Sequence, residues 1–221
     1  MSWGISFPEV MKSFEKRSPE KENSLQSLSL RTKNNDIRDM SASRKRETKE
    51  TSIEVFLKTE GAGIIQVDTG IELLDEILSA IARGAGFDLT VKARGDLETG
   101  DHHTTEDTAI TLGSTFAQEI KSGIGSSMVP SGQCVAIAAV RFGEPGYQGD
   151  FLLQSHTLGG MCLENFSHFL RALAYNGKFN LAIRAEGGDD RSRIEAMSTA
   201  LGRAIKKAVR DGKKDRNLIR D

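Results

Sequence analysis

The amino-acid sequence predicts an α/β (α+β) fold that is internally duplicated, with the order strand–strand–helix–strand–helix (ββαβα) in each half. The stretch TSIEVFLKT at 51–59 alternates apolar and polar residues, which is typical of a half-buried strand. Between Ile71 and Ile81 the apolar residues follow helical spacing instead. The segment FDLTVKA at 87–93 recurs as FNLAIRA at 179–185, so the same order of elements is expected twice.

In the first half, the strand at 51–59 is followed by GIIQVDT at 63–69, which indicates a second strand after a Gly-Ala-Gly turn. The helix that comes next is expected to end at Gly84 and Gly86. A strand at 87–93 and a polar loop then lead to a second helix. The residues of that helix expected to face inward are Ala109, Leu112, Phe116 and Ile120.

The second half repeats this order. CVAIAAVRF at 134–142 and DFLLQSH at 150–156 indicate two strands. A helix is expected within 163–174, a strand at 179–185 and a last helix over 193–209.

Matched residues favour duplication over two unrelated amphipathic units, which is the alternative explanation. Glu106 precedes Gly113 by seven residues, and Glu195 precedes Gly202 by the same interval.

The chain divides into three parts by composition. Residues 1–45 are polar and charge-rich, with too little apolar content to fold alone, so we expect a disordered extension. Residues 46–211 form one domain, with the first repeat at 51–122 and the second at 134–209. Residues 212–221 are a charged tail.

The overall composition excludes several classes of protein. A net charge of −1 over 221 residues gives no general attraction to nucleic acid or to a membrane, so neither is expected as a partner. The sequence has no apolar run long enough to span a bilayer and no secretory signal, and two cysteines make no disulfide framework. We therefore expect a soluble, cytoplasmic protein.

One motif carries clear chemistry, DHHTTED at 101–107. His102 and His103 lie four and three residues before Glu106, so the three side chains share one face at a helix start. Imidazole with carboxylate suits Mn²⁺, Fe²⁺ or Zn²⁺ better than Ca²⁺. Asp101 is placed to cap the helix or to hold a histidine N–H. The alternative is two exposed histidines that simply open a helix.

The second half carries a changed version of this motif. In the repeat, Arg191, Ser192 and Glu195 stand where His102, His103 and Glu106 stand in the first half. On the preceding helices, Glu76 corresponds to His168. Alone, His168 would be a partly buried histidine, and the repeat makes it a candidate ligand.

With these residues in view, the chain resembles the imidazoleglycerol-phosphate dehydratase family of histidine biosynthesis. The most specific segments are RETKET at 46–51, DTGIELLDEIL at 68–78, and the stretches 86–113 and 163–183. The resemblance implies that each half is a sheet backed by helices. It also implies a large symmetric homo-oligomer with two Mn²⁺ ions per active site at subunit boundaries. The reaction implied is loss of water from imidazole glycerol phosphate, which gives imidazole acetol phosphate.

The resemblance also assigns roles to residues. It implies that Glu106 and Glu195 are catalytic and that Glu50 contacts the substrate. The metal ligands implied, with Glu76 included as a competent carboxylate, are His102, His103, Glu106, His168, Glu195 and Glu76. Arg191 and Arg193 stand where cations would meet a substrate phosphate, or else are ordinary surface arginines beside Asp189 and Asp190.

Several family positions differ in this sequence. Glu76 and Gly84 replace histidines, Arg191 and Ser192 replace a second His–His pair, and Thr199 and Glu144 replace a lysine and an arginine. A family arginine is also missing near residue 124. At most one tightly held ion per site is therefore expected. Three functions stay open: a divergent dehydratase, a non-catalytic relative acting as a binding or assembly subunit, and a hydro-lyase or isomerase acting on another anionic substrate.

Overall fold

The computed structural model describes residues 41–218, with side chains as far as residue 213. The prediction of a disordered extension falls mostly on residues 1–40, which lie outside the described residues. None of the helices in the described part is both long and apolar enough to cross a membrane.

Two four-stranded sheets with the same topology make up the strands of the fold. The first has the order β1-β2-β4-β3 and the second β5-β6-β10-β7. In each sheet three strands run antiparallel, and the last pairs in parallel with its neighbour. The strands are β1 (Ser41–Glu47), β2 (Thr51–Lys58), β3 (Ile65–Asp68), β4 (Asp88–Gly95), β5 (Gly123–Ser131), β6 (Cys134–Phe142), β7 (Gly146–Asp150) and β10 (Phe179–Glu186), and β8 (Thr157–Leu158) with β9 (Met161–Cys162) forms a short hairpin.

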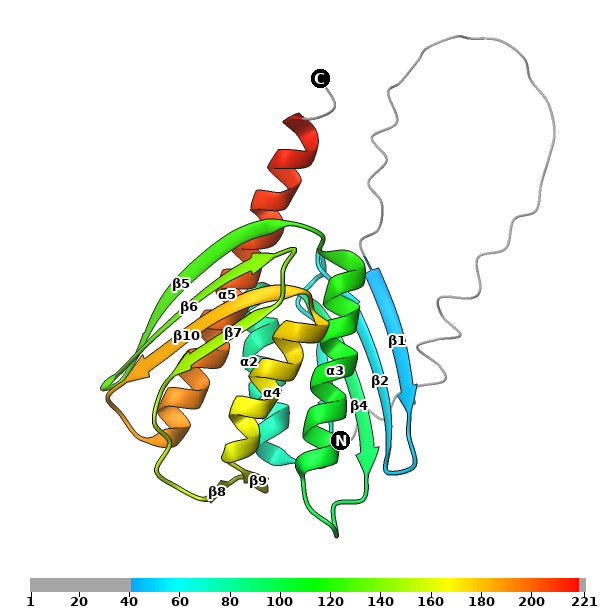
Figure 1. Ribbon diagram of the computed structural model, residues 1–221, viewed down its shortest axis with the longest axis vertical. Helices are drawn as coiled ribbons and strands as arrows, with labels where there is room; N and C mark the ends of the chain where they lie inside the picture. The colour runs from blue at the N-terminus through cyan, green and yellow to red at the C-terminus, as the bar shows by residue number, and fades with distance from the viewer. Residues whose placement is uncertain (1–40, 219–221) are drawn as a thin grey trace, which may run out of the picture. The chain divides into compact units, whose positions relative to one another are not determined.

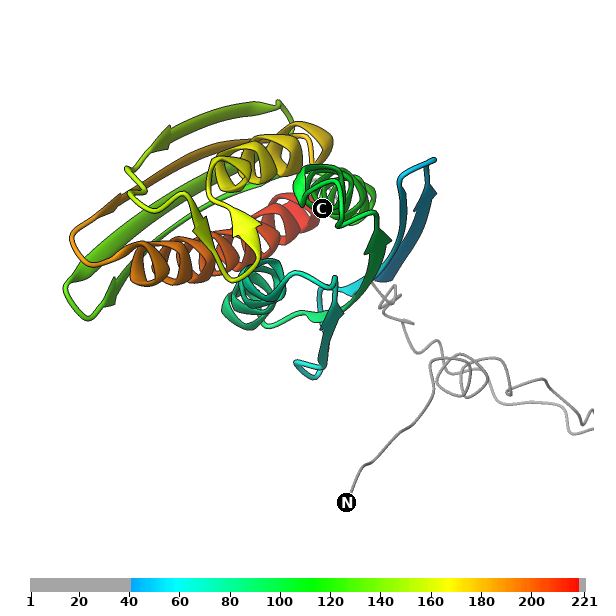
Figure 2. The ribbon, with the colours of Figure 1, turned by 90° about the horizontal axis from the view of Figure 1, so that it is seen from below.

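Four helices lie between the two sheets, as Figures 1 and 2 show from two directions. They are α2 (Glu72–Ala85), α3 (His102–Glu119), α4 (Glu164–Asn176) and α5 (Asp190–Leu218). Helix α2 packs against α5, and α3 packs against α4. Each helix pair therefore takes one helix from each half of the chain. The predicted α/β fold of two similar halves is confirmed.

The recurring segments FDLTVKA and FNLAIRA occupy the same place in the two sheets. The first lies in β4, which pairs with β2 and β3. The second lies in β10, which pairs with β6 and β7. Their alternate residues are buried because both strands are central and face the helices on one side only.

Each four-stranded sheet has one strand more than predicted, because β1 and β5 were missed, and the short β8–β9 hairpin was also not predicted. Strand β1 begins at Ser41, inside the stretch assigned to the polar extension, and its only buried residue is Ala42. It is an edge strand held by backbone pairing with β2, so its sequence lacks apolar alternation. The folded part thus begins before residue 46.

Strand β5 escaped prediction because its hydrophobic pattern is inverted. The buried side of β5 carries Gly123, Gly125, Ser127 and Val129, whereas Ile124 and Met128 are exposed. A Cβ at position 125 would stand only 2.0 Å from the Ala204 carbonyl oxygen of α5. Small residues are therefore needed where the strand meets the helix.

Two further boundaries differ from prediction. The strand predicted at 150–156 lies instead at Gly146–Asp150, because the Asp190 carboxylate accepts the backbone N–H groups of Gln154 and Ser155 and holds that segment in a loop. Helix α5 runs to Leu218, so residues 212–218 of the predicted tail are helical. Lys and Arg are good helix formers, which explains why α5 continues beyond its last apolar residues.

Candidate functional site

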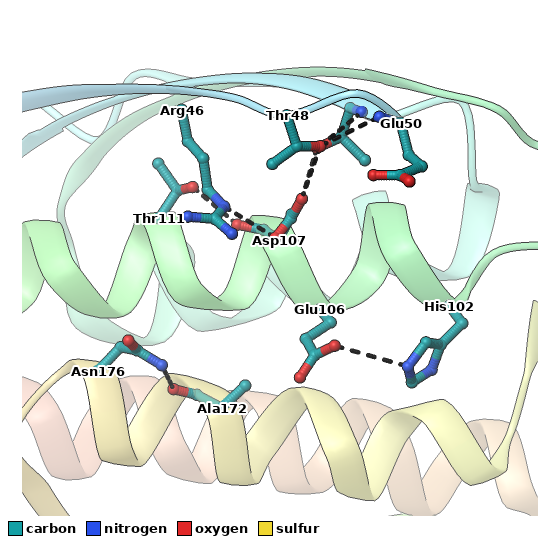
Figure 3. Close-up of polar contacts among 10 residues, drawn as sticks. Arg46, Thr48, Glu50, His102, Glu106, Asp107, Thr111, Ala172 and Asn176 are labelled. Carbon is teal, nitrogen blue, oxygen red and sulfur yellow. Dashed lines mark hydrogen bonds and ion pairs between the residues drawn. The ribbon is translucent and has the colours of Figure 1, made fainter.

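The DHHTTED motif lies at the start of α3, beside the start of α4. His102 is the first residue of α3, and Glu106 follows one turn later on the same side. Their side chains approach to 3.5 Å between His102 Nε2 and Glu106 Oε2 (Figure 3). This is too long for a good N–H···O hydrogen bond, so both groups keep their ligand atoms available.

His103 and His168 both lie beside the His102 ring. The His102 ring centroid lies 5.8 Å from that of His103 and 5.8 Å from that of His168, both in edge-on arrangements. All three histidines and Glu106 are exposed. His168 is thus exposed rather than partly buried, and it joins the cluster from α4. We call these four residues the histidine cluster.

An asparagine that sequence reasoning missed supports the cluster. Asn165 on α4 is buried, and its Oδ1 lies 2.9 Å from His102 Nδ1. Its Nδ2 donates to Asp101 Oδ2 at 2.9 Å. Asp101 makes no side-chain capping bond to α3, so the expectation of a cap is wrong. A polar residue on the apolar face of LENFSHFL was the signal in the sequence.

The remaining predicted ligands lie on the other helix pair, α2 and α5. Glu76 and Glu195 line a cavity of 290 Å³ together with Arg83, Arg191 and the buried Ser198. No histidine lines this cavity.

An ion pair occupies this second pair of helices. Arg191 Nη1 donates to both carboxylate oxygens of Glu76, at 2.5 and 2.6 Å, and Nη2 lies 3.5 Å from Glu72. The hydrogen bond to Glu76 raises the pKa of Arg191 above its ordinary value. Both oxygens of Glu76 are therefore taken by a protein cation.

The two helix pairs correspond to one another through the repeat. Glu76 is the fifth residue of α2, and His168 is the fifth residue of α4. Arg191 stands near the start of α5, as His102 does at the start of α3. The Arg191–Glu76 ion pair thus occupies the position that corresponds to the His102–His168 contact.

The six predicted ligands do not form one metal site within a chain. Among the described residues, no three His, Cys, Asp or Glu side chains converge in a way that would hold an ion. Glu76 lies on the α2–α5 pair, whereas His102 and His168 lie on the α3–α4 pair.

Arg193 is engaged by the backbone rather than directed at a substrate. Its Nε donates to the Gly187 carbonyl at 2.8 Å and its Nη1 to the Leu152 carbonyl at 2.5 Å. The side chain is only 15% exposed and also lies 3.5 Å from Asp190. The structure therefore places Arg193 in loop packing beside Asp190.

Glu50 lies apart from the histidine cluster, across α3. Figure 3 shows Glu50 in the β1–β2 turn on one side of the helix, and Glu106 with His102 on the other. Asp107 ties this turn to α3, since it accepts hydrogen bonds from Arg46 Nε at 2.8 Å and Thr51 Oγ1 at 2.5 Å. Thr48 Oγ1 in turn accepts the Glu50 backbone N–H.

Comparison with known proteins shows which family the chain matches. Residues 69–205 match the family model described as imidazoleglycerol-phosphate dehydratase. The imidazoleglycerol-phosphate dehydratase of Desulforudis audaxviator is 40% identical over 173 residues, covering 75% of this chain and 88% of the relative. The histidine biosynthesis bifunctional protein of Bacteroides fragilis is 37% identical over 171 residues, covering 75% of this chain and 46% of that protein. The crystal structure of the Staphylococcus aureus dehydratase superposes with a TM-score of 0.68 at 24% identity, over 77% of this chain and 98% of that one, and shows the shared fold.

Proposed function

Because the chain belongs to the imidazoleglycerol-phosphate dehydratase family, we propose that it removes water from imidazole glycerol phosphate in histidine biosynthesis. The observation that carries this proposal is the histidine cluster, in which helices from both halves bring His102, His103, His168 and Glu106 together. Imidazoles and a carboxylate are suitable ligands for a divalent metal ion that assists a reaction on an imidazole ring.

The donor set suits one divalent transition metal, with Mn²⁺ as the proposed ion. His102, His103, His168 and Glu106 are proposed as ligands shared with groups from a second copy of the chain, since their side chains are exposed. Bound there, the ion would polarise the imidazole ring of the substrate and stabilise it as it loses a proton. Because no three ligands converge within the described part of one chain, a second copy is proposed to complete the site, which favours a homo-oligomer.

Glu106 is proposed to move the proton. Its carboxylate is exposed at the cluster, so it is free to accept the proton from the substrate carbon. The C–O bond on the neighbouring carbon then breaks, and the departing hydroxide leaves as water once it is protonated. Glu195 occupies the corresponding position on α5 and is proposed to act from the other half of the repeat.

Arg191 and Glu50 are proposed to contact the substrate. Arg191 is exposed on α5, so a phosphate would compete with Glu76 for its guanidinium. Glu50 lies across α3 from the histidine cluster of its own chain, so it would serve the site of a neighbouring copy. Both roles place the complete site between copies of the chain.

The Arg191–Glu76 ion pair favours a second candidate function, that of a non-catalytic family member serving as a binding or assembly subunit. A family reaction that uses two ions would lose several kcal/mol of transition-state stabilisation if only one ion were bound. Each ~1.4 kcal/mol corresponds to a tenfold change in rate. We therefore propose weak rather than full dehydratase activity.

The test is turnover of imidazole glycerol phosphate by the purified native protein, with Mn²⁺ and after chelation. Formation of imidazole acetol phosphate that depends on Mn²⁺ is the expected result. Absence of product under both conditions would replace the dehydratase proposal by the non-catalytic one.

A further inference from the structure

Asn165 is a buried amide that bonds in two directions at the edge of the histidine cluster. It is 8% exposed and is the only polar residue on the buried face of α4, among Phe166, Phe169 and Leu170. Burying an amide is unfavourable unless its atoms are paired, and here both are. The pairing therefore calls for a role beyond filling space.

Asp101 fixes which way the Asn165 amide points. An ionised carboxylate only accepts hydrogen bonds, so the atom 2.9 Å from Asp101 Oδ2 must be the amide nitrogen. The amide oxygen is then left facing His102 Nδ1, also at 2.9 Å. A carbonyl oxygen can only accept, so His102 must carry its proton on Nδ1.

The other nitrogen of His102 then carries a lone pair when the ring is neutral. His102 Nε2 is the atom nearest Glu106, at 3.5 Å, and the His102 ring lies edge-on to His168. We propose that Asn165, held by Asp101, is a positioning residue that keeps the His102 proton on Nδ1 and presents the Nε2 lone pair to the histidine cluster. This inference rests on the proposed function only in taking His102 as a metal ligand.

The tautomer can be read without any metal or substrate. With the ring nitrogens of all four histidines labelled with ¹⁵N, nitrogen NMR distinguishes an N–H from a lone-pair nitrogen, and His102→Gln identifies the signal. The metal-free full-length protein is measured at about pH 8.5, where histidine is neutral. We expect the Nδ1–H form in the native protein.

Two variants remove the constraint from opposite ends. Asn165→Leu removes the acceptor, and an unconstrained neutral histidine side chain favours the Nε2–H tautomer, so we expect His102 to shift towards Nε2–H. Asp101→Ala leaves the Asn165 amide free to turn, so we expect a mixture, and it is a second route if Asn165→Leu does not fold. The matched control is Asn176→Leu on the same helix, since the Asn176 amide bonds only the Ala172 carbonyl (Figure 3).

Affinity for Mn²⁺, measured by equilibrium dialysis, is the second readout. Loss of an orienting partner lowers metal affinity by about 10- to 100-fold, so we expect that loss for Asn165→Leu and none for Asn176→Leu. An Nδ1–H tautomer that persists in both Asn165→Leu and Asp101→Ala would overturn the proposal. A changed tautomer with unchanged Mn²⁺ affinity would overturn the part that concerns the metal. Absence of dehydratase turnover would leave the tautomer result standing, so the two proposals fail separately.

Discussion

Asp190 binds two backbone N–H groups of the loop before α4 and also lies near Arg193. Burial opposes its ionisation, but the hydrogen bonds from Ser155 and Gln154 prevail and lower its pKa below 3.8. A lowered folded-state pKa means that the stabilisation is complete above the ordinary value and disappears as the pH falls through the folded one. The loop should therefore loosen only in acid.

We expect Asp190→Asn to lower the free energy of unfolding by about 1.5–3 kcal/mol at pH 7, the usual size for a charged hydrogen-bonded group. The difference should shrink below about pH 4, because the unfolded state then binds a proton at Asp190 before the native state does. Urea unfolding at several pH values measures both effects. A difference in the free energy of unfolding that stays constant down to pH 2 would contradict the lowered pKa of Asp190.

Asp107 lies next to Glu106 in sequence but faces the β1–β2 turn, where it accepts from Arg46 and Thr51. Asp107→Ala should free the turn that carries Glu50 and raise KM by about tenfold, equivalent to about 1.4 kcal/mol of binding. The control Thr111→Val removes a hydroxyl that bonds only the Asp107 carbonyl oxygen. Steady-state kinetics measure KM for both variants. Equal KM values would show that Asp107 does not contribute to substrate binding.

At the scale of elements, the paired glycines Gly113 and Gly202 are explained by close helix contact. A Cβ at Gly113 would lie 2.7 Å from the Leu173 carbonyl oxygen of α4, and one at Gly202 would lie 2.1 Å from the Ile81 carbonyl oxygen of α2. Neither helix pair can accept a methyl group without moving apart. The same packing requirement therefore keeps glycine in both halves.

Gly113→Ala and Gly202→Ala should each lower the free energy of unfolding by about 1–3 kcal/mol, as overpacking does. Alanine by itself favours a helix by about 1 kcal/mol over glycine, so the sign of the change separates packing from helix propensity. Ser114→Ala, one residue along α3, is the control. Denaturant melts that show higher stability for both glycine variants would rule out the close-contact explanation.

How far the elements could be predicted depends on which forces shape them. Strands β2, β4 and β10 were predictable because burial on one face imposes apolar alternation. Strand β5 was not, because contact with α5 demands glycine at positions 123 and 125 and leaves Ile124 outside. The DHHTTED motif predicted three members of the histidine cluster, yet the Asn165 and Asp107 contacts depend on residues about 60 positions apart.

At the scale of the whole molecule, the two helix pairs have the same architecture but different chemistry. The α3–α4 pair carries three imidazoles, and the α2–α5 pair carries the Arg191–Glu76 ion pair in the corresponding place. A guanidinium bonded to both oxygens of a carboxylate competes with any metal for that carboxylate. We therefore propose metal binding at only one helix pair of each chain.

This asymmetry is tested by metal content. We expect at most one tightly held ion per chain after loading with Mn²⁺, lost in the double variant His102→Ala, His103→Ala and retained in the corresponding double variant Arg191→Ala, Ser192→Ala. Elemental analysis of the three dialysed proteins gives the answer. Two ions per native chain, or equal metal content in both double variants, would show that the two helix pairs do not differ in metal binding.

The most direct test of the whole account is the rate of imidazole acetol phosphate formation by Glu106→Gln with Mn²⁺ present. Glutamine keeps the shape of Glu106 but cannot accept a proton, so we expect turnover to fall by at least about 100-fold, the size of a general-base contribution. Glu119→Gln, in the last turn of the same helix, should retain the native rate. Native turnover in Glu106→Gln would contradict the placement of the reaction at the histidine cluster.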